Sequence, residues 1–335
     1  MKYLITGGAG FIGSNFIHYL FAKYPDCEIT NLDKLTYAGN LDNLKEFETK
    51  PRYKFVKGDI GDENLVDGLV ANCDIIVNFA AESHVDRSIL GPKEFVQTNV
   101  VGTQNLLEAA VKHKKRFHHI STDEVFGSLP LNSVEKFTAQ TPYDPSSPYS
   151  ASKAASDHLV RSYARTFGLQ ATITNCSNNY GPYQFIEKLI PLMYINAKLG
   201  KKLPVYGNGS NVRDWIHVED HNAGVDVVLG KGKIGETYLL GGNAEKSNLE
   251  VVKTILKLMG KDDSLIEFVK DRPGHDLRYA IDSSQTEKEL GWTRKHDFES
   301  GMRDTIAWYD AHEDWWRKLL SKDYLQYYEQ QYKGR

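Results

Sequence analysis

The fold is decided by a short glycine-rich stretch near the start of the chain, Gly7-Gly8-Ala9-Gly10-Phe11-Ile12-Gly13. An apolar run, residues 3–6, precedes this stretch, and a helical pattern, residues 14–23, follows it. Between a strand and a helix, such glycines allow a tight turn and let the backbone approach a pyrophosphate, which the helix N-terminus attracts. We therefore predict a dinucleotide-binding turn, and the expected contacts are Gly7, Gly10, Phe11, Ile12 and Gly13.

Apolar runs and helical patterns continue to alternate through the first half of the chain. The expected strands are residues 3–6, 29–33, 53–58, 74–80, 117–122 and 171–176, and the expected helices are 14–23, 63–71, 92–113 and 152–167. This alternation predicts βαβ units with right-handed crossovers and a parallel sheet that is covered on both faces. The fold class is therefore α/β, with a Rossmann-type doubly wound parallel sheet.

The pattern loosens after residue 177, where Asn178-Asn179-Tyr180-Gly181-Pro182 forms a turn-rich break. Helical patterns then fall at 187–199, 220–229, 249–259 and 298–311, and short strand patterns at 237–240 and 266–269. We expect a first domain over residues 1–177, to which residues 211–242 return. A smaller mixed α/β substrate domain is expected mainly over 178–335, and its aromatic tail, 308–335, should pack onto the body or a partner subunit.

Composition narrows the class of protein. The chain has 335 residues and a formal net charge of −3, so it lacks the basic balance of a nucleic-acid-binding protein. We find no apolar stretch near 18 residues and no signal peptide, which argues against a membrane protein. Cys27, Cys73 and Cys176 are widely spaced and odd in number, which is typical of buried reduced thiols in a cytoplasmic protein.

Two aspartates follow expected strands at positions that meet a dinucleotide. Asp33 lies twenty residues after Gly13, where a carboxylate binds a ribose 2′-hydroxyl and repels a 2′-phosphate, so the residues favour NAD over NADP. Lys34, the next residue, weakens this preference slightly. Asp59, in Gly58-Asp59-Ile60, suits the adenine edge, although an aspartate that caps the next turn fits the same position.

A tyrosine and a lysine begin the helix expected after Pro148. In Tyr149-Ser150-Ala151-Ser152-Lys153, the i, i+4 spacing puts Tyr149 and Lys153 on one helix face. A free phenol has a pKa of about 10, and a nearby ammonium and an oxidised nicotinamide ring both lower that pKa. Such a tyrosine can take the proton from an alcohol while a hydride leaves to NAD. The alternative is an ordinary surface helix face.

Two adjacent acids follow the fifth expected strand, in Ser121-Thr122-Asp123-Glu124. Ligands of open α/β sheets bind beyond the carboxyl ends of the strands, so Thr122, Asp123 and Glu124 should face the substrate near Tyr149. Neighbouring carboxyls on a loop are usually solvated. At this position they can instead form an acid–base pair, one protonated and one ionised by its surroundings.

Together these residues resemble the extended short-chain dehydrogenase/reductases that act on nucleotide sugars, and more narrowly the branch of dTDP-glucose 4,6-dehydratases. The resemblance covers essentially the whole chain. It is carried by residues 7–13, 80–88, 121–127, 149–153, 175–182, 213–215 and 272–276, and the Thr122-Asp123-Glu124 element is the most specific part. The resemblance implies bound NAD with further contacts from Ile60, Ala80, Ala81, Tyr149 and Lys153.

The resemblance also implies a reaction. Tyr149 takes the proton from the hydroxyl on carbon 4 of dTDP-glucose while NAD takes the hydride, and Thr122 hydrogen-bonds that oxygen. Glu124 then removes the proton on carbon 5, and protonated Asp123 donates to the departing hydroxyl of carbon 6. Hydride returns to carbon 6, which gives dTDP-4-keto-6-deoxyglucose and water with no net change in oxidation state. Lys153 supports Tyr149 throughout.

The substrate contacts that the resemblance implies are spread over the second half of the chain. Ser83, His84, Asn178, Lys188 and Asn248 are expected near the sugar and phosphates, Arg213, Arg272 and His275 at the diphosphate, and Tyr206 at the base. Arg272 could instead pair with Asp271 or Asp276. The chain departs from the family pattern at Ile186, where a proline is usual, and this loss predicts a looser loop over the sugar.

Several alternatives stay open. An epimerase or decarboxylase on the same scaffold is disfavoured by Asp123, because epimerisation at carbon 4 needs no acid at carbon 6. UDP-glucose is an alternative substrate, and a non-catalytic dinucleotide sensor would not need Tyr149, Lys153 and the acidic pair. His217 and His221 lack a third ligand at metal-binding spacing, so we expect helix capping and packing and no metal. In this family, helices such as 92–113 and 152–167 form a four-helix bundle between subunits, which implies a homodimer.

Overall fold

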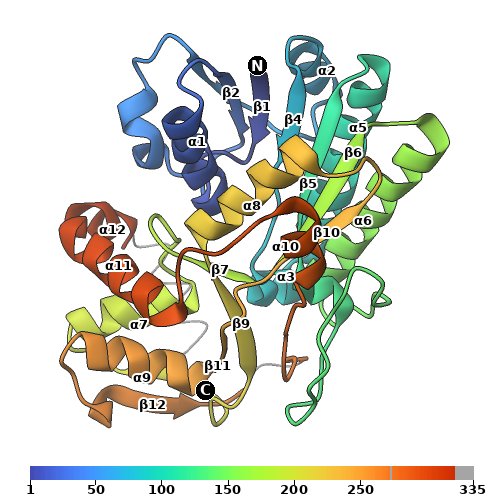
Figure 1. Cartoon of the computed structure of the whole chain (residues 1–335). Coiled ribbons are helices and arrows are strands. Elements are labelled where there is room, and N and C mark those ends of the chain that lie inside the picture. The colour runs from blue at the N-terminus through green and yellow to red at the C-terminus, as the bar shows by residue number, and fades with distance from the viewer. Residues whose placement is uncertain (272–273, 321–335) are drawn as a thin grey trace.

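The first part of the chain forms one parallel sheet of seven strands in the order β10-β6-β5-β4-β1-β2-β3. We describe a computed structural model, which covers residues 1–271 and 274–320 (Figure 1). The strands are β1 (Lys2–Thr6), β2 (Glu28–Asp33), β3 (Tyr53–Lys57), β4 (Ile75–Asn78), β5 (Arg116–Thr122), β6 (Ala171–Cys176) and β10 (Thr237–Leu240). The strand order steps outward from β1 in both directions, which confirms the predicted doubly wound α/β fold.

Helices cover both faces of this sheet because side chains alternate along each strand. On β1, Tyr3 and Ile5 pack with α1 (Phe11–Lys23) and α8 (Val218–Lys231), whereas Leu4 packs with α2 (Glu63–Ala71), α5 (Thr103–Lys112) and α6 (Pro148–Phe167). All residues of β4 and β6 are buried. These two short apolar runs are therefore central strands that are covered on both sides.

The helix expected over residues 92–113 is present but is not uniform. It consists of α4 (Pro92–Phe95), the π-helical segment η2 (Val96–Gly102) and α5. Within η2, the buried Asn99 accepts from the Glu82 backbone N–H at 2.9 Å, and its amide donates to the Glu82 carbonyl at 3.0 Å and to Ser152 Oγ at 2.8 Å. The wider turn thus ties the loop after β4 to α6. A shorter helix, α3 (Val85–Leu90), precedes this segment.

The second part of the chain surrounds its own core below the first sheet (Figure 1). One small sheet contains β11 (Glu245–Ser247), β9 (Val212–His217) and β7 (Asn178–Tyr180), and another pairs β12 (Ile266–Val269) with β8 (Leu203–Tyr206). The helices are α7 (Leu189–Lys198), α9 (Asn248–Leu258), α10 (Ser284–Leu290), α11 (Phe298–Ala311) and α12 (Glu313–Leu319). Single 3₁₀ segments are η1 (Leu41–Phe47), η3 (Asp123–Phe126) and η4 (Asp263–Leu265). This mixed region agrees with the fold class that the sequence indicated.

The chain crosses between the two regions more than once. Strand β10 pairs with β6, and α8 packs against α1, so residues 218–240 lie with the first sheet. The first described part of the aromatic tail packs on the body, where Trp315 Nε1 donates to Asn43 Oδ1 at 2.8 Å. Residues 321–335 of the tail lie outside the described residues. The domain limits at residue 177 and over 211–242 remain a prediction.

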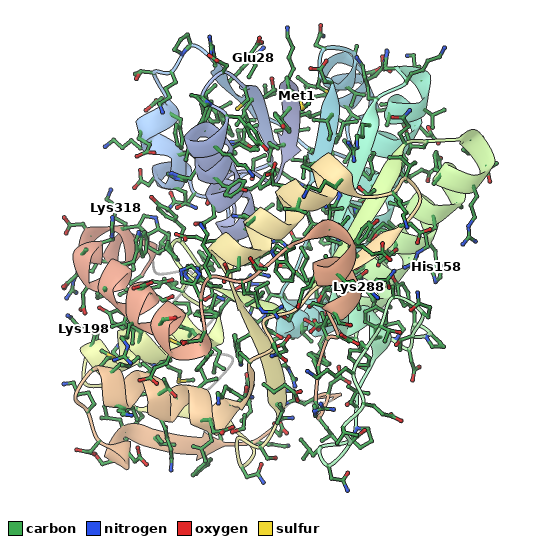
Figure 2. The ribbon with its side chains drawn as sticks, in the orientation of Figure 1. Met1, Glu28, His158, Lys198, Lys288 and Lys318 are labelled. Carbon is green, nitrogen blue, oxygen red and sulfur yellow. The ribbon has the colours of Figure 1, made fainter. Side chains whose placement is uncertain are left out.

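Charged side chains lie at the surface, and the three cysteines are buried as predicted. Lys198, Lys288 and Lys318 project outward from the ribbon (Figure 2). Cys27, Cys73 and Cys176 are all buried free thiols. Across the two described ranges, no helix is both long enough and apolar enough to cross a membrane.

Candidate active site

The glycine turn is closely packed. A Cβ atom on Gly13 would lie 2.5 Å from the Gly7 carbonyl oxygen, and one on Gly7 would lie 2.6 Å from the Ala80 nitrogen. Gly10 is the N-cap of α1 and contributes no side-chain hydrogen bond to the first N–H groups of that helix. Those N–H groups are therefore available to a phosphate at the positive end of the helix dipole. The turn opens into a cavity of about 310 Å³.

The same cavity collects most of the residues that we predicted to bind the cofactor. Its lining includes the expected residues Gly7, Gly10, Phe11, Ile12, Gly13, Asp33, Asp59, Ile60, Ala80, Ala81, Tyr149 and Lys153. The cavity therefore runs from the glycine turn to the start of α6. Thr36, Tyr37, Thr98 and Ser177 also line it, and sequence reasoning missed them.

Two carboxylates at the end of neighbouring strands are held differently. Asp33 accepts hydrogen bonds from the backbone N–H groups of Ala9 at 2.9 Å and Leu35 at 2.8 Å, while burial raises its pKa. Asp59 forms an ion pair with Lys34 at 2.7 Å and accepts from the Gly61 N–H. Because Lys34 is paired with Asp59, its charge is partly neutralised beside the position where a 2′-phosphate would lie. Asp33 thus lies at the cavity, and its part in ribose recognition stays a prediction.

Gly13→Ala is expected to weaken NAD binding at least tenfold, because its Cβ atom would displace the turn that receives the pyrophosphate. Gly68→Ala provides a matched control, since Gly68 is exposed within α2 and its added Cβ would meet nothing within 4 Å. The control should leave binding unchanged and stabilise the fold by about 0.5–1 kcal/mol. Isothermal titration of both variants with NAD checks this, and equal affinities would contradict the placement of the turn.

The start of α6 fixes the tyrosine and the lysine. Ser147 and Ser150 form a reciprocal capping box, and Pro148 occupies the first helical turn. This cap places Tyr149 at the beginning of the helix, with Lys153 one turn later on the same face. Both side chains are buried and line the cavity.

The acidic turn lies beside this helix. Thr122 ends β5 and caps η3, accepting from the Glu124 backbone N–H at 3.3 Å. Thr122 also hydrogen-bonds Tyr149, which lowers the pKa of that phenol. Thr122, Asp123 and Glu124 line the same cavity as Tyr149 and Lys153. The acidic turn, the phenol and the lysine therefore lie at one cavity.

The expected effect of Lys153 on Tyr149 needs correction. Burial raises the pKa of Tyr149 well above 10, and the Glu124 carboxylate raises it further. The Lys153 ammonium does not outweigh these two effects, and its Nζ donates to the Ile120 carbonyl at 2.8 Å and lies 3.2 Å from His119 Nε2. In the protein alone the phenol is thus held neutral, and the charge of an oxidised nicotinamide ring is the group that favours the phenolate.

One member of the acidic pair, Asp123, is buried. Burial raises the pKa of Asp123 well above its ordinary value, and Glu124 and Asp214 raise it further by repulsion. Asp123 Oδ2 is buried and makes no hydrogen bond to another described residue, while Oδ1 accepts from Thr122 Oγ1 at 3.3 Å. A protonated Asp123 therefore fits this position, and a carboxylic acid there can donate a proton.

The residues expected at the sugar and phosphates separate into two groups. Ser83, Asn178 and Lys188 line the cavity, and Lys188 Nζ donates to the Ser83 carbonyl at 3.3 Å. His84 lies directly behind them, with Nε2 at 3.8 Å from Glu187 Oε1. These residues come from the loop after β4 and from the approach to α7, so the two regions of the chain meet at the cavity.

The second group lies outside the cavity lining. Tyr206 and His275 have ring centroids 6.1 Å apart, and His275 Nδ1 lies 2.6 Å from Asp271. Arg213 is buried over the Tyr279 ring and donates to the Val212 and Asp276 carbonyls. Asn248 begins α9, and its N–H donates to the Asn211 carbonyl. Arg272 lies outside the described residues.

The packing of Ile186 argues against the looser loop that we predicted at this position. The side chain of Ile186 is fully buried in the core of the second region, among residues of α7, α9 and α11. Beside it, Glu187 forms a bidentate pair with Arg87 of α3 at 2.9 and 3.3 Å. An apolar anchor and an ion pair thus hold the loop where the family has a proline.

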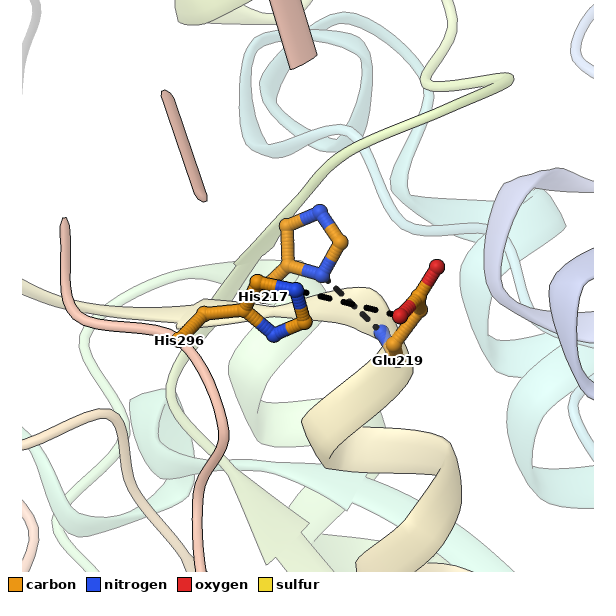
Figure 3. Close-up of side chains that lie close together, drawn as sticks. All are labelled: His217, Glu219 and His296. Atoms are coloured by element: carbon orange, nitrogen blue, oxygen red, sulfur yellow. Dashed lines mark hydrogen bonds and ion pairs between the residues drawn. The ribbon is translucent and has the colours of Figure 1, made fainter. Parts of the chain in front are cut away.

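His217, Glu219 and His296 form the one described cluster of three or more side chains with metal-ligand geometry, each offering an atom within 4.8 Å of the others (Figure 3). His217 caps α8 by accepting from the Glu219 N–H at 3.4 Å, which confirms the expected cap. His296 Nδ1 lies 3.1 Å from Asp220, and that contact raises the pKa of His296. Hydrogen bonds with the Glu219 N–H and with Asp220 thus engage the Nδ1 atoms of His217 and His296.

Comparison with known proteins identifies the relatives of this chain. Residues 4–305 match the family described as GDP-mannose 4,6 dehydratase. The chain is 54% identical to a dTDP-glucose 4,6-dehydratase of Mycolicibacterium smegmatis, over 95% of this chain and 96% of the relative. It is 51% identical to one from Escherichia coli, over the full length of both.

Solved structures give the same result. A dTDP-glucose 4,6-dehydratase from Streptomyces venezuelae, with NAD bound, superposes with a TM-score of 0.92 at 49% identity, covering 95% of this chain and 100% of the other. A UDP-glucuronic acid 4-epimerase from Bacillus cereus superposes with a TM-score of 0.87 at 26% identity, covering 93% and 99%. The scaffold is thus shared with epimerases, and the higher identity lies with the dehydratases.

Proposed function

Because this chain belongs to the NAD-dependent dTDP-glucose 4,6-dehydratases, we propose that it converts dTDP-glucose to dTDP-4-keto-6-deoxyglucose and water in the cavity between its two regions. The observation that carries this proposal is the convergence of Thr122, Asp123, Glu124, Tyr149 and Lys153 on one cavity. A hydride-transfer site needs only the tyrosine and lysine. The acidic pair adds the groups that elimination requires.

The residues present fit NAD. The uncapped N–H groups of α1 meet the pyrophosphate, and the Asp33 carboxylate meets the adenosine ribose. When bound, NAD accepts the hydride from carbon 4 of the glucose and later returns it to carbon 6. The chain itself supplies the proton transfers on either side of that exchange.

Oxidation needs a base at carbon 4. Tyr149 takes the proton of the carbon-4 hydroxyl, and Thr122, which hydrogen-bonds Tyr149, also holds the reacting oxygen. The Lys153 ammonium stabilises the charge that develops on the phenol from within the same buried site. The ketone that forms then acidifies the proton on carbon 5.

Elimination uses the two carboxyls in opposite states. Glu124 removes the carbon-5 proton, and protonated Asp123 donates to the departing carbon-6 hydroxyl, which leaves as water. Glu124 returns its proton to carbon 5 as hydride reaches carbon 6. Tyr149 then holds one extra proton and Asp123 lacks one. The Thr122 hydroxyl, which contacts both residues, offers a path that resets them.

We place the nucleotide beyond the sugar, toward the second group of residues. Arg213, Arg272 and His275 bind the diphosphate, Tyr206 contacts the base, and Asn248 and His84 lie nearby. The burial of Arg213 over Tyr279 supports this placement, since a guanidinium fixed by an aromatic ring is preorganised to bind an anion.

Incubation with dTDP-glucose, and separately with UDP-glucose, tests the function by mass spectrometry of the products. We expect a loss of one water from dTDP-glucose and a slower loss from UDP-glucose. Faster reaction of UDP-glucose would reassign the nucleotide. An unchanged mass together with an epimerised sugar would reassign the reaction, and no conversion of either would leave a binding protein.

We also propose that the enzyme is a cytoplasmic homodimer. Val96 in η2 and Phe167 at the end of α6 are exposed apolar side chains on the helices expected at the subunit contact. Ile89 and Leu90, at the end of the preceding helix α3, are exposed as well. A second copy of the chain is the occupant that fits this face, because a four-helix bundle buries such residues. Light scattering should give twice the mass of one chain, and a single-chain mass would contradict the dimer. The three free thiols support the cytoplasmic location.

A further inference from the structure

Lys153 contacts buried polar groups that the proposed mechanism does not use. Its Nζ lies 3.2 Å from Nε2 of His119, and the same Nε2 lies 3.5 Å from Oδ1 of Asp157, one helical turn after Lys153. The side chains of His119 and Asp157 are 0% exposed. A lysine, an imidazole and a carboxylate are therefore arranged in line inside the protein, behind the wall of the cavity.

The carboxylate at the far end accepts three hydrogen bonds at one of its oxygens. Oδ2 of Asp157 accepts from Tyr143 Oη at 2.8 Å, from Ser121 Oγ at 2.9 Å and from Asn175 Nδ2 at 3.2 Å. Arg161 donates to the same Tyr143 hydroxyl and attracts Asp157 electrostatically. Hydrogen bonds and a nearby cation both favour the ionised form, although burial acts in the opposite direction and raises the pKa.

The imidazole between them is fixed at both ring nitrogens. Nδ1 of His119 faces the side-chain amide of Asn78 at 3.2 Å, and Nε2 also lies 3.3 Å from Ser156 Oγ. An amide presents a donor or an acceptor according to which end faces the ring, so it supports either neutral tautomer. Burial and the nearby Lys153 hold the pKa of His119 well below its ordinary value, so the ring stays neutral.

We infer that Asp157 and His119 are positioning residues for the reaction, and that they keep the buried Lys153 charged and oriented toward the site. An ammonium without a counter-ion is costly to bury, and Asp157 is the carboxylate that acts on Lys153 from within the protein. His119 spans the gap between the two charges. This inference rests on the proposed function, because it assigns a task to Lys153 in hydride transfer.

The direction of the effect on Lys153 follows from its surroundings. Burial lowers the pKa of Lys153 to about 8, and Asp157 and Cys176 oppose this. The groups that contact it or act on it are Asp157 from α6, His119 and the Ile120 carbonyl from β5, and Cys176 from β6, and burial raises the pKa of the Cys176 thiol to about 12. Asp157 is therefore the one full negative charge in this set, and removing it should lower the pKa of Lys153 further.

The test is the pH dependence of kcat/KM for dTDP-glucose in the whole enzyme. Activity that needs the ammonium falls as the pH rises through the pKa of Lys153. Asp157→Asn should move this alkaline limb to lower pH by about one unit or more, since an opposite charge nearby shifts a pKa by roughly 1–3 units. The asparagine keeps an oxygen for the three donors, so the variant removes charge more than structure.

His119 gives a second, independent pair of variants. A glutamine amide extends about as far as Nε2, whereas an asparagine amide extends only to about Nδ1. His119→Asn should therefore shift the alkaline limb as Asp157→Asn does, and His119→Gln should restore part of the wild-type profile. His118→Gln is the matched control, because His118 is equally buried on β5 but faces Thr172 and Thr174 of β6. His118→Gln should change the stability of the fold without moving the alkaline limb of the pH profile.

The outcomes separate the inference from the function on which it rests. If the wild-type chain does not dehydrate dTDP-glucose, the proposed function fails before any variant is compared. If the wild-type chain is active, and the pH profiles of Asp157→Asn and His119→Asn are the same as the wild-type pH profile, the positioning role is wrong. If Asp157→Asn does not fold, the His119 variants decide, and an equal shift in His118→Gln would also overturn the inference.

Discussion

Tyr149→Phe is expected to lower the rate of carbon-4 oxidation by about 10²–10⁴-fold, the usual contribution of a positioned acid–base group. The phenol is the one titratable hydroxyl in the cavity that also hydrogen-bonds Thr122. Without it, no base lies beside the substrate alcohol. Stopped-flow absorbance after mixing with dTDP-glucose should show no NADH, because the block precedes hydride transfer.

The control for this variant uses the same helix and the same change. Tyr163 lies on α6, where its hydroxyl donates to Glu108 at 3.3 Å, away from the cavity. Tyr163→Phe should keep the NADH signal and the turnover of the wild-type chain. An undiminished NADH signal in Tyr149→Phe would remove the tyrosine from the oxidation step and leave only its packing role.

The first half of the fold could be predicted because its signals are local. The apolar runs of β1, β4 and β6 are short and bounded by turns, and the glycine stretch joins β1 to α1. The strands of the three-stranded sheet in the second region carry no such signal. Strand β9 reads Val212-Arg213-Asp214-Trp215-Ile216-His217 and is buried almost throughout, because Tyr279 covers Arg213 and backbone N–H groups of Gly242 and Ala244 bind Asp214.

The candidate site shows the same division between local and tertiary information. Helical spacing correctly places Tyr149 and Lys153 on one face, but it does not reveal what lies opposite that face. His119 and the Ile120 carbonyl come from β5, and both contact the Lys153 ammonium. The π-helical segment could not be predicted either, since Asn99 gains its partners only when the loop after β4 and α6 come together.

The scaffold itself does not choose between dehydration and epimerisation. A UDP-glucuronic acid 4-epimerase shares it with a TM-score of 0.87, so the distinction lies in a few side chains. Oxidation at carbon 4 is common to both reactions and needs only Tyr149 and its support. Dehydration needs, in addition, an acid for the leaving hydroxyl. The buried Asp123 is the residue that we propose for this task, because burial and the nearby Glu124 and Asp214 carboxylates raise its pKa well above its ordinary value.

Asp123→Asn and Glu124→Gln should therefore slow water loss by about 10²-fold or more while changing carbon-4 oxidation far less. Both carboxyls act after the hydride has left carbon 4, so NADH should form at nearly the wild-type rate and then persist. Asp123→Asn removes the proton donor and keeps the shape of the side chain. Stopped-flow absorbance measures NADH formation and decay in one trace, and mass spectrometry measures product.

The persistence of NADH is the result that distinguishes the two chemical steps. Glu135→Gln, an exposed residue in the loop that follows β5, is the control and should leave both phases unchanged. If the acidic-pair variants lose NADH formation and product in equal measure, the carboxyls act on oxidation or only shape the site. Asp123 and Glu124 would then have no separate step to catalyse. The raised pKa of Asp123 would be a consequence of its burial alone.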